Sequence, residues 1–206
     1  MTTMRKLPIG IQSFENIRNE NYLYVDKTAL IYQLVTKGKP YFLSRPRRFG
    51  KSLLVSTLKC YFEGKKELFK GLAIDKLEKE WKQYPVFHLS FGGQNYIEPY
   101  TLEHVLEEFV ARAELVYGKD ELAKTLSSRF RAVLKKAHAK TGVRAVVLID
   151  EYDKPLLDVM DMDISVQNEY GKMTLEDYNR NLLKGVYSVF KEADDDLQFV
   201  LLTGVT

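Results

Sequence analysis

Residues 41–54 read YFLSRPRRFGKSLL, and this stretch decides what kind of fold the chain can have. It contains Gly50, Lys51 and Ser52, the last three positions of the phosphate-binding pattern G-x-x-x-x-G-K-[ST]. Where that pattern begins with a glycine, this sequence has Arg45. The context is still the one such a loop needs, because an apolar strand candidate precedes it and a helical pattern follows Lys51.

A phosphate-binding loop works by surrounding phosphates with backbone N–H groups at a helix N-terminus. The closest approach to phosphate is made at Gly50, which is present, whereas Arg45 stands where the strand gives way to the loop. We therefore expect a phosphate site formed by a group of loop residues: Arg47, Arg48, Phe49, Gly50, Lys51, Ser52 and Leu53. Arg47 and Arg48 have an equally good alternative interpretation as solvated loop arginines.

A second motif, VVLIDEYD at residues 146–153, places two carboxylates after four apolar residues. Asp150 at the tip of a buried strand is suited to hold Mg²⁺ together with Ser52, as in a Walker B strand. Glu151 directly after it can deprotonate a water that attacks the terminal phosphate. The alternative is a strand that merely ends in an acidic turn. The presence of both motifs in one chain favours a nucleotide site.

Apolar runs alternate with amphipathic helical patterns along the chain, which predicts an α/β fold with a mostly parallel sheet. Strands are expected at 41–43, 85–91, 145–149 and 197–202. Helices are expected after Asp26 as N-cap, from Lys51 to near Gly64, and over 101–117, 120–140 and 174–193. The strand at 85–91 is an extra unit between the two motifs, and Thr203 follows the last strand at the position of a polar sensor residue.

Composition sets further bounds. The chain has 206 residues, a net charge of +3, one cysteine and three histidines. This charge is too small to indicate nucleic acid or membrane binding, and a lone cysteine excludes an internal disulfide. No run of apolar residues is long enough to cross a bilayer. We expect a cytoplasmic protein without a zinc site.

The chain resembles the AAA-ATPase-like family of bacterial and archaeal proteins. The resemblance rests on LPIGIQSFENIRNENYLYVDKTALI (7–31), FLSRPRRFGKSLLVSTL (42–58), VVLIDEYDKPL (146–156) and FVLLTGVT (199–206). In that family the loop characteristically reads R-P-R-R-F-G-K-S, so Arg45 is ordinary here. The resemblance implies a three-layer P-loop NTPase fold of the type with an additional strand and a catalytic glutamate.

The same resemblance implies the roles of individual residues and the organisation of the chain. Lys51, Glu151 and Thr203 would be catalytic, and Ser52 and Asp150 would hold the metal. We expect an N-terminal segment (1–38) packed on a P-loop ATPase domain (39–206). That domain would be incomplete after the sensor strand, because a last strand and a nuclease-like domain usually follow in the family.

The function expected is Mg²⁺-dependent ATP binding and hydrolysis that drives a conformational switch. One alternative is a nucleotide-binding regulatory module with little hydrolysis, since no arginine finger is evident in the sequence. Another is a DNA-associated protein coupled to a nuclease-like domain, with nucleic acid bound only through that domain. Besides ATP, the expected partners are a second copy of the chain or another protein, and no membrane. The segment at 24–28 fits either a helix cap at Asp26 or part of a base pocket.

Overall fold

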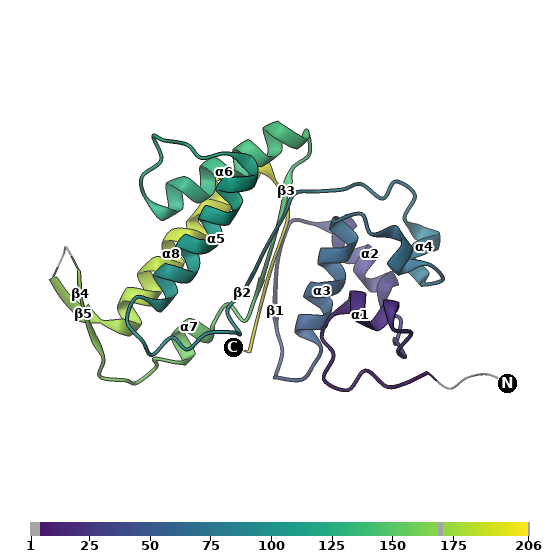
Figure 1. Cartoon of the computed structure of the whole chain (residues 1–206), viewed down its shortest axis with the longest axis horizontal. Helices are drawn as coiled ribbons and strands as arrows, with labels where there is room; N and C mark the ends of the chain where they lie inside the picture. The colour runs from purple at the N-terminus through teal and green to yellow at the C-terminus, as the bar shows by residue number, and fades with distance from the viewer. Residues whose placement is uncertain (1–4, 169–170, 206) are drawn as a thin grey trace.

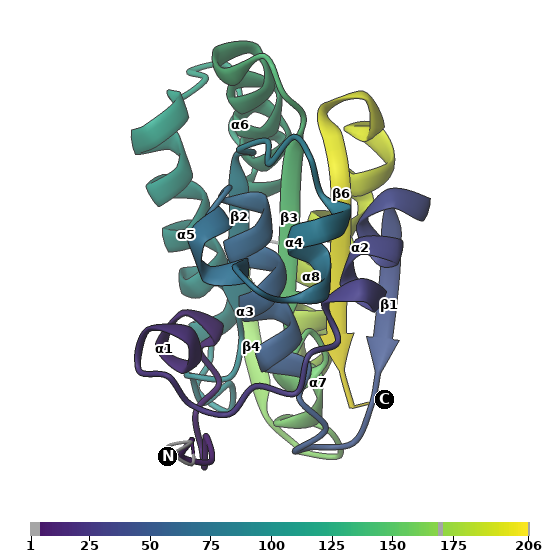
Figure 2. The ribbon, with the colours of Figure 1, turned by 90° about the vertical axis from the view of Figure 1, so that its right-hand side faces the viewer.

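A four-stranded sheet lies between two layers of helices in the computed structural model of the chain, which describes residues 5–168 and 171–205 (Figure 1). The strands of this sheet are β1 (Pro40–Ser44), β2 (Val86–Ser90), β3 (Ala145–Asp150) and β6 (Leu197–Gly204). They are all parallel and stand in the order β1-β6-β3-β2 (Figure 2). The last strand in the sequence therefore separates the two strands that carry the motifs.

The helices divide between the two faces of the sheet (Figure 1). One layer holds α1 (Phe14–Asn19), α2 (Thr28–Lys37), α3 (Lys51–Phe62) and α4 (Ala73–Leu77), with a 3₁₀ turn at Lys66–Phe69. The other holds α5 (Thr101–Tyr117), α6 (Leu126–Thr141), α7 (Lys154–Leu157) and α8 (Leu175–Glu192), with a 3₁₀ turn at Asp194–Asp196. No helix in the described part of the chain is long and apolar enough to cross a membrane.

The central strand β3 shows why the sequence needs both layers. All of its residues are buried, and successive side chains point to opposite faces. Val147 and Ile149 pack into the core with α5, α6 and α8, whereas Val146 and Leu148 pack into the core with α1 to α4. A continuous apolar run is what a parallel strand covered on both faces requires.

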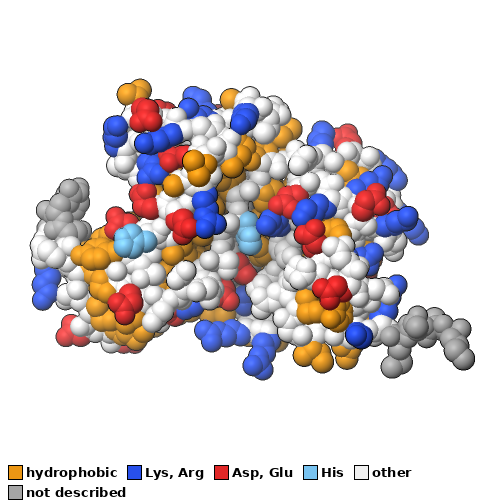
Figure 3. All heavy atoms as spheres, in the orientation of Figure 1, with side chains coloured by type: hydrophobic (Ala, Val, Ile, Leu, Met, Phe, Trp, Pro, Cys, Tyr) orange, Lys and Arg blue, Asp and Glu red, His pale blue; other side chains and the backbone are white. Residues whose placement is uncertain are grey.

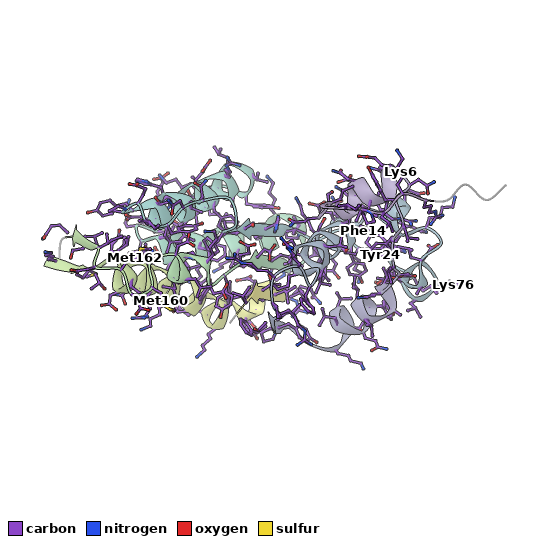
Figure 4. All side chains as sticks on the ribbon, turned by 90° about the horizontal axis from the view of Figure 1, so that it is seen from below. Lys6, Phe14, Tyr24, Lys76, Met160 and Met162 are labelled. Atoms are coloured by element: carbon purple, nitrogen blue, oxygen red, sulfur yellow. The ribbon has the colours of Figure 1, made fainter. Side chains whose placement is uncertain are left out.

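The N-terminal part, from residue 5 to residue 38, packs directly on the P-loop side of the sheet. Phe14 is fully buried, its ring lies 5.1 Å from that of Tyr24, and its N–H donates to Ser56 Oγ on α3 at 2.9 Å (Figure 4). Because Phe14 shares one core with Leu148 of the central strand, this segment has no separate core.

At the other end of the molecule a small hairpin extends the α8 side. Strands β4 (Ser165–Asn168) and β5 (Gly171–Thr174) pair antiparallel, and Val159, Val166 and Leu175 form a minor core beneath them. Figure 4 places Met160 and Met162 at this end, far from Phe14 and Tyr24. The sequence patterns did not predict this hairpin or α1, α4 and α7.

Several expected boundaries differ from the structure. The expected helix over 120–140 begins only at Leu126, because Thr125 and Ser128 form a reciprocal capping box. The apolar strand expected at 41–43 is the edge strand β1, where Phe42 is 55% exposed. The last strand continues to Gly204, so Thr203 lies within β6.

Asp26 is also placed differently from the expected N-cap. The helix begins at Thr28 with Lys27 as the capping residue, and Asp26 Oδ1 accepts from the Thr28 N–H at 2.8 Å. Its other oxygen accepts from the Ala73 N–H at 2.7 Å, at the start of α4. Asp26 therefore joins two helices and does not cap one in the usual geometry.

Candidate nucleotide-binding site

The sequence motifs meet at one edge of the sheet, because the carboxyl ends of parallel strands share an edge. Backbone hydrogen bonds hold the loops together there. The Arg45 N–H donates to the Gly204 carbonyl at 3.2 Å, and the Tyr152 N–H donates to the Thr203 carbonyl at 2.9 Å. The loops after β1 and β3 are thus both fastened to the end of β6. This is the edge at which open α/β sheets bind their ligands.

The loop between β1 and α3 has the backbone that a phosphate cradle needs. Arg48 and Gly50 both lie in the left-handed region, with φ of 68° and 76°, and Gly50 is the N-cap of α3. A methyl group at Gly50 would meet nothing within 4 Å, so the glycine is required by its backbone angle and not by crowding. The N–H groups in the first turn of a helix have no partners within the helix, so they are available to an anion.

Lys51 is buried, with 7% exposure, yet no carboxylate among the described residues forms an ion pair with it. Its ammonium donates to the carbonyl oxygens of Arg45 at 2.7 Å and Pro46 at 3.0 Å. A buried charge satisfied only by neutral acceptors favours the arrival of an anion, which would replace weaker partners with charge-assisted hydrogen bonds.

Asp150 and Thr203 form a buried pair. The Thr203 hydroxyl, which is fully buried, donates to Asp150 Oδ1, and the Glu151 N–H donates to the same oxygen at 3.1 Å. Oδ2 accepts no hydrogen bond from any described residue. One carboxylate oxygen is therefore used to fix the side chain, and the second remains available to a metal-bound water.

Glu151 adopts a left-handed backbone conformation, with φ of 55°. Its carboxylate lies against Gly92, just after β2, so closely that a methyl group at Gly92 would lie 2.8 Å from Oε2. The carboxylate is half-buried and accepts no hydrogen bond from the residues that the structure describes. It is thus positioned by packing and left free to accept a proton.

A cavity of about 780 Å³ brings most of these groups together. Its P-loop wall consists of Arg47, Arg48, Gly50, Lys51, Ser52 and Leu53. Glu151, Asp153, Lys154 and Asp158 line it from the β3 side. Asp150 and Thr203 are not part of the wall and lie in the buried layer before Glu151.

Both loop arginines are exposed, and their side chains form no hydrogen bond or ion pair with the described residues. In Figure 3, Lys and Arg side chains project at the lower edge of the molecule, the end at which the loop after β1 lies.

A second cavity, of about 430 Å³, adjoins the loop on its apolar side. Phe49, Gly50, Lys51 and Leu53 line it from the P-loop. Leu23, Tyr24, Val25 and Leu30 line it from the N-terminal segment. Burial raises the pKa of the Tyr24 hydroxyl, which therefore stays neutral. A mostly apolar pocket, with the charged side chains of Lys27 and Lys51 in its lining, could accept a planar ring beside this loop.

The residues present fit Mg²⁺ bound together with a nucleotide. No cluster of three or more His, Cys, Asp or Glu side chains that could hold a metal ion occurs within residues 5–168 and 171–205. Mg²⁺ in phosphate-transfer sites commonly uses one or two protein oxygens, with the remaining positions filled by phosphate and water. The Ser52 hydroxyl, which has no described hydrogen-bond partner, could supply one of those oxygens, and Asp150 Oδ2 could accept from a metal-bound water.

Sequence reasoning missed several residues of this site. Gly92 and Asp158 were not singled out. In the structure Lys154 pairs with Asp158, while Asp153 Oδ2 accepts from the Val205 N–H at 2.7 Å. The doublet Gly92-Gly93 after a strand could have indicated a close approach at the same sheet edge.

Comparison with known proteins places the chain among similar sequences. A family model described as "Predicted AAA-ATPase" matches residues 8–206. A protein described as "Uncharacterized protein in vnfD 5'region", from Azotobacter chroococcum mcd 1, is 39% identical over 206 residues. The alignment covers 98% of this chain and 37% of that relative, so the chain spans well under half of the relative's length. No solved structure matches the chain.

Proposed function

The chain belongs to the AAA-ATPase-like family, and from that premise we propose that it binds ATP with Mg²⁺ and hydrolyses it to drive a conformational switch. One observation carries the proposal. Lys51 and Ser52 from the P-loop and Glu151 from the end of β3 line a single cavity. A phosphate cradle beside an unpaired carboxylate can both hold a triphosphate and activate a water molecule.

Binding would use both cavities. The N–H groups at the start of α3, together with Lys51, would contact the β- and γ-phosphates, and Arg47 and Arg48 would add charge at the mouth. The base would lie in the apolar cavity between Phe49 and Tyr24. This arrangement uses the segment at 24–28 as part of the base pocket, in addition to the link that Asp26 makes between helices.

Hydrolysis would depend on Glu151. Its carboxylate would take a proton from the water as the water oxygen attacks the γ-phosphorus and the bond to the β,γ-bridging oxygen breaks. Thr203 would act through Asp150 by holding its carboxylate in one orientation. Mg²⁺, held by Ser52 and Asp150, would neutralise charge on the phosphate oxygens.

The proposal is tested by calorimetric titration of Mg²⁺-ATP into the wild-type chain, Lys51→Ala and Glu151→Gln, followed by phosphate release. We expect saturable binding in the wild type, loss of binding in Lys51→Ala, and retained binding with turnover reduced at least about a hundredfold in Glu151→Gln.

Tight binding without turnover in the wild type would instead support the regulatory module. Equal loss of binding and turnover in Glu151→Gln would remove the catalytic role of that residue. If neither the wild type nor either variant bound Mg²⁺-ATP, the proposed nucleotide site would be wrong.

A further inference from the structure

Lys154 is a fourth cationic side chain on the wall of the phosphate cavity, and the P-loop motifs do not account for it. It is the first residue of α7, and its N–H donates to the Glu151 carbonyl at 3.0 Å. One tight turn therefore carries both the carboxylate at Glu151 and the ammonium at Lys154.

The ammonium of Lys154 is held in position from two sides. It forms an ion pair with Asp158, one helical turn later, and lies 5.6 Å from the centre of the Tyr96 ring. Tyr96 is fully buried, so its ring is a fixed surface. A cation on an aromatic face is restrained without losing its capacity to donate hydrogen bonds.

The turn itself is anchored in the fold. Asn179 of α8 is buried and its side-chain N–H donates to the Pro155 carbonyl at 3.0 Å, while the Leu157 N–H donates to the Asp153 carbonyl at 2.9 Å. These hydrogen bonds fix the backbone around Lys154. A residue that binds a ligand with defined geometry needs such support.

The simpler explanation is that Lys154 and Asp158 only stabilise α7. Ion pairs of this spacing on helix surfaces contribute little to stability. The pair here is not on an open surface, because both side chains are about one-fifth exposed and line the cavity with Lys51 and Glu151. The Asp158 carboxylate also accepts from the Tyr96 N–H at 3.4 Å, so this carboxylate is positioned by a second partner as well.

We propose that Lys154 contacts the terminal phosphate of the bound triphosphate and makes the site prefer a triphosphate over a diphosphate. The inference rests on the proposed function. When the ligand binds, the ammonium exchanges its contact with Asp158 for phosphate oxygens. The chain thereby supplies, from its own β3 side, a cation opposed to the developing negative charge.

The test is the ratio of dissociation constants for Mg²⁺-ADP and Mg²⁺-ATP, measured by calorimetry in the wild type and in Lys154→Met. A charged hydrogen bond to the third phosphate predicts that Lys154→Met weakens ATP binding about tenfold and leaves ADP binding unchanged. Lys154→Arg keeps the charge and should keep the preference. Lys135→Met, an exposed lysine on α6, is the matched control and should behave as the wild type.

Asp158→Asn separates the proposal from the simpler explanation. This substitution removes the ion pair between Asp158 and Lys154 but leaves the Lys154 ammonium in place, so the preference for ATP over ADP should persist. Equal weakening of ATP and ADP in Lys154→Met, or the same loss of preference in Asp158→Asn, would overturn the role of Lys154. Failure of the wild type to bind either nucleotide would instead overturn the proposed function and, with it, this inference.

Discussion

A single residue, Arg45, shows how the loop after β1 can have another residue where the phosphate-binding pattern begins with a glycine. Arg45 does not lie in the left-handed region, so this position does not require a glycine. Both backbone polar groups of Arg45 form hydrogen bonds. Its N–H donates to the Gly204 carbonyl, and its carbonyl accepts from the Lys51 ammonium. The left-handed angles of the loop occur instead at Arg48 and Gly50. The side chain at position 45 is therefore free to vary, whereas its backbone is not.

Gly92 offers a test of whether the position of the Glu151 carboxylate matters. A methyl group at Gly92 would lie 2.8 Å from Oε2, and the flexible carboxylate would have to move. We expect Gly92→Ala to bind ATP as the wild type does but to lose up to about a hundredfold in kcat, because small displacements of a catalytic group are costly.

Gly93→Ala is the control for this change, since a methyl group there meets nothing within 4 Å. Phosphate release under saturating ATP measures the effect. Equal turnover in the two variants would show that the contact with Gly92 does not position Glu151.

Among the elements, α5 and α6 are joined by a charged cluster in which Arg129 and Glu114 are largely buried and the side chain of Glu107 is more exposed. Arg129 donates to Glu114 at 2.9 and 2.7 Å and also pairs with Glu107. The hydrogen bonds from Arg129 lower the pKa of the Glu114 carboxyl. A carboxylate whose pKa is lowered by folding stabilises the native state above its unfolded pKa, and this stabilisation is lost as the pH falls through the folded pKa.

This linkage predicts a specific acid sensitivity. The wild type should lose stability as the pH falls below the ordinary range of a glutamate pKa, because the unfolded chain then binds a proton at residue 114 that the folded chain does not. Glu114→Gln should be less stable at neutral pH but should lose less over the acid range, because it has no carboxylate to protonate. Melting temperatures measured by circular dichroism between pH 7 and pH 3 give the comparison. Parallel curves for the two proteins would contradict the prediction.

The elements also show what sequence patterns can and cannot reveal. The helix at 101–117 and the strand β3 were predicted because each carries an apolar pattern along its own length. α4 has no such local signal: its first N–H groups, at Ala73 and Ile74, donate to Asp26 and Thr28. Those acceptors lie more than forty positions away in the sequence, so no local sequence pattern predicts this helix.

In the candidate site, too, some residues carry a local sequence signal and others do not. Lys51, Asp150 and Glu151 were recognisable because each motif carries its chemistry within a few consecutive residues. Gly92 reaches the site only through tertiary structure, by the pairing of β2 with β3. Asp158 is a local neighbour of Lys154, but the helix α7 that brings them together was not predicted. The contribution of Gly92 depends on which loops the sheet brings together, and this cannot be read from local spacing.

At the scale of the whole molecule, Gly204 lies where three parts of the chain meet. It pairs with Ser44 of β1, and a methyl group there would lie 2.6 Å from Tyr152 Cδ1 and 2.8 Å from Asp153 Oδ2. The ring of Tyr152 also contacts Phe42, with ring centres 4.9 Å apart. This point therefore connects the edge strand with the loop that carries Glu151.

We expect Gly204→Ala to lower the free energy of unfolding by about 1–3 kcal/mol, because the ring of Tyr152 cannot move away without disturbing its neighbours. Nucleotide binding should weaken in the same variant, since the Arg45 N–H donates to the Gly204 carbonyl and the Arg45 carbonyl accepts from the Lys51 ammonium. Chemical denaturation and calorimetry measure the two effects, again with Gly93→Ala as control. Unchanged stability would show that the loops can separate at this point.

The pairing of β1 with β6 has a consequence for how the protein is made. Within the described sheet, the strand at residues 40–44 has only the strand at residues 197–204 as a neighbour. During synthesis the ribosome must therefore release nearly the whole described chain before the P-loop strand finds its place. Such long-range pairing is slow to form and leaves an apolar edge unprotected in the meantime. The loop after β1 is thus positioned late, and under the proposed function binding of nucleotide would report that a newly made chain has finished folding.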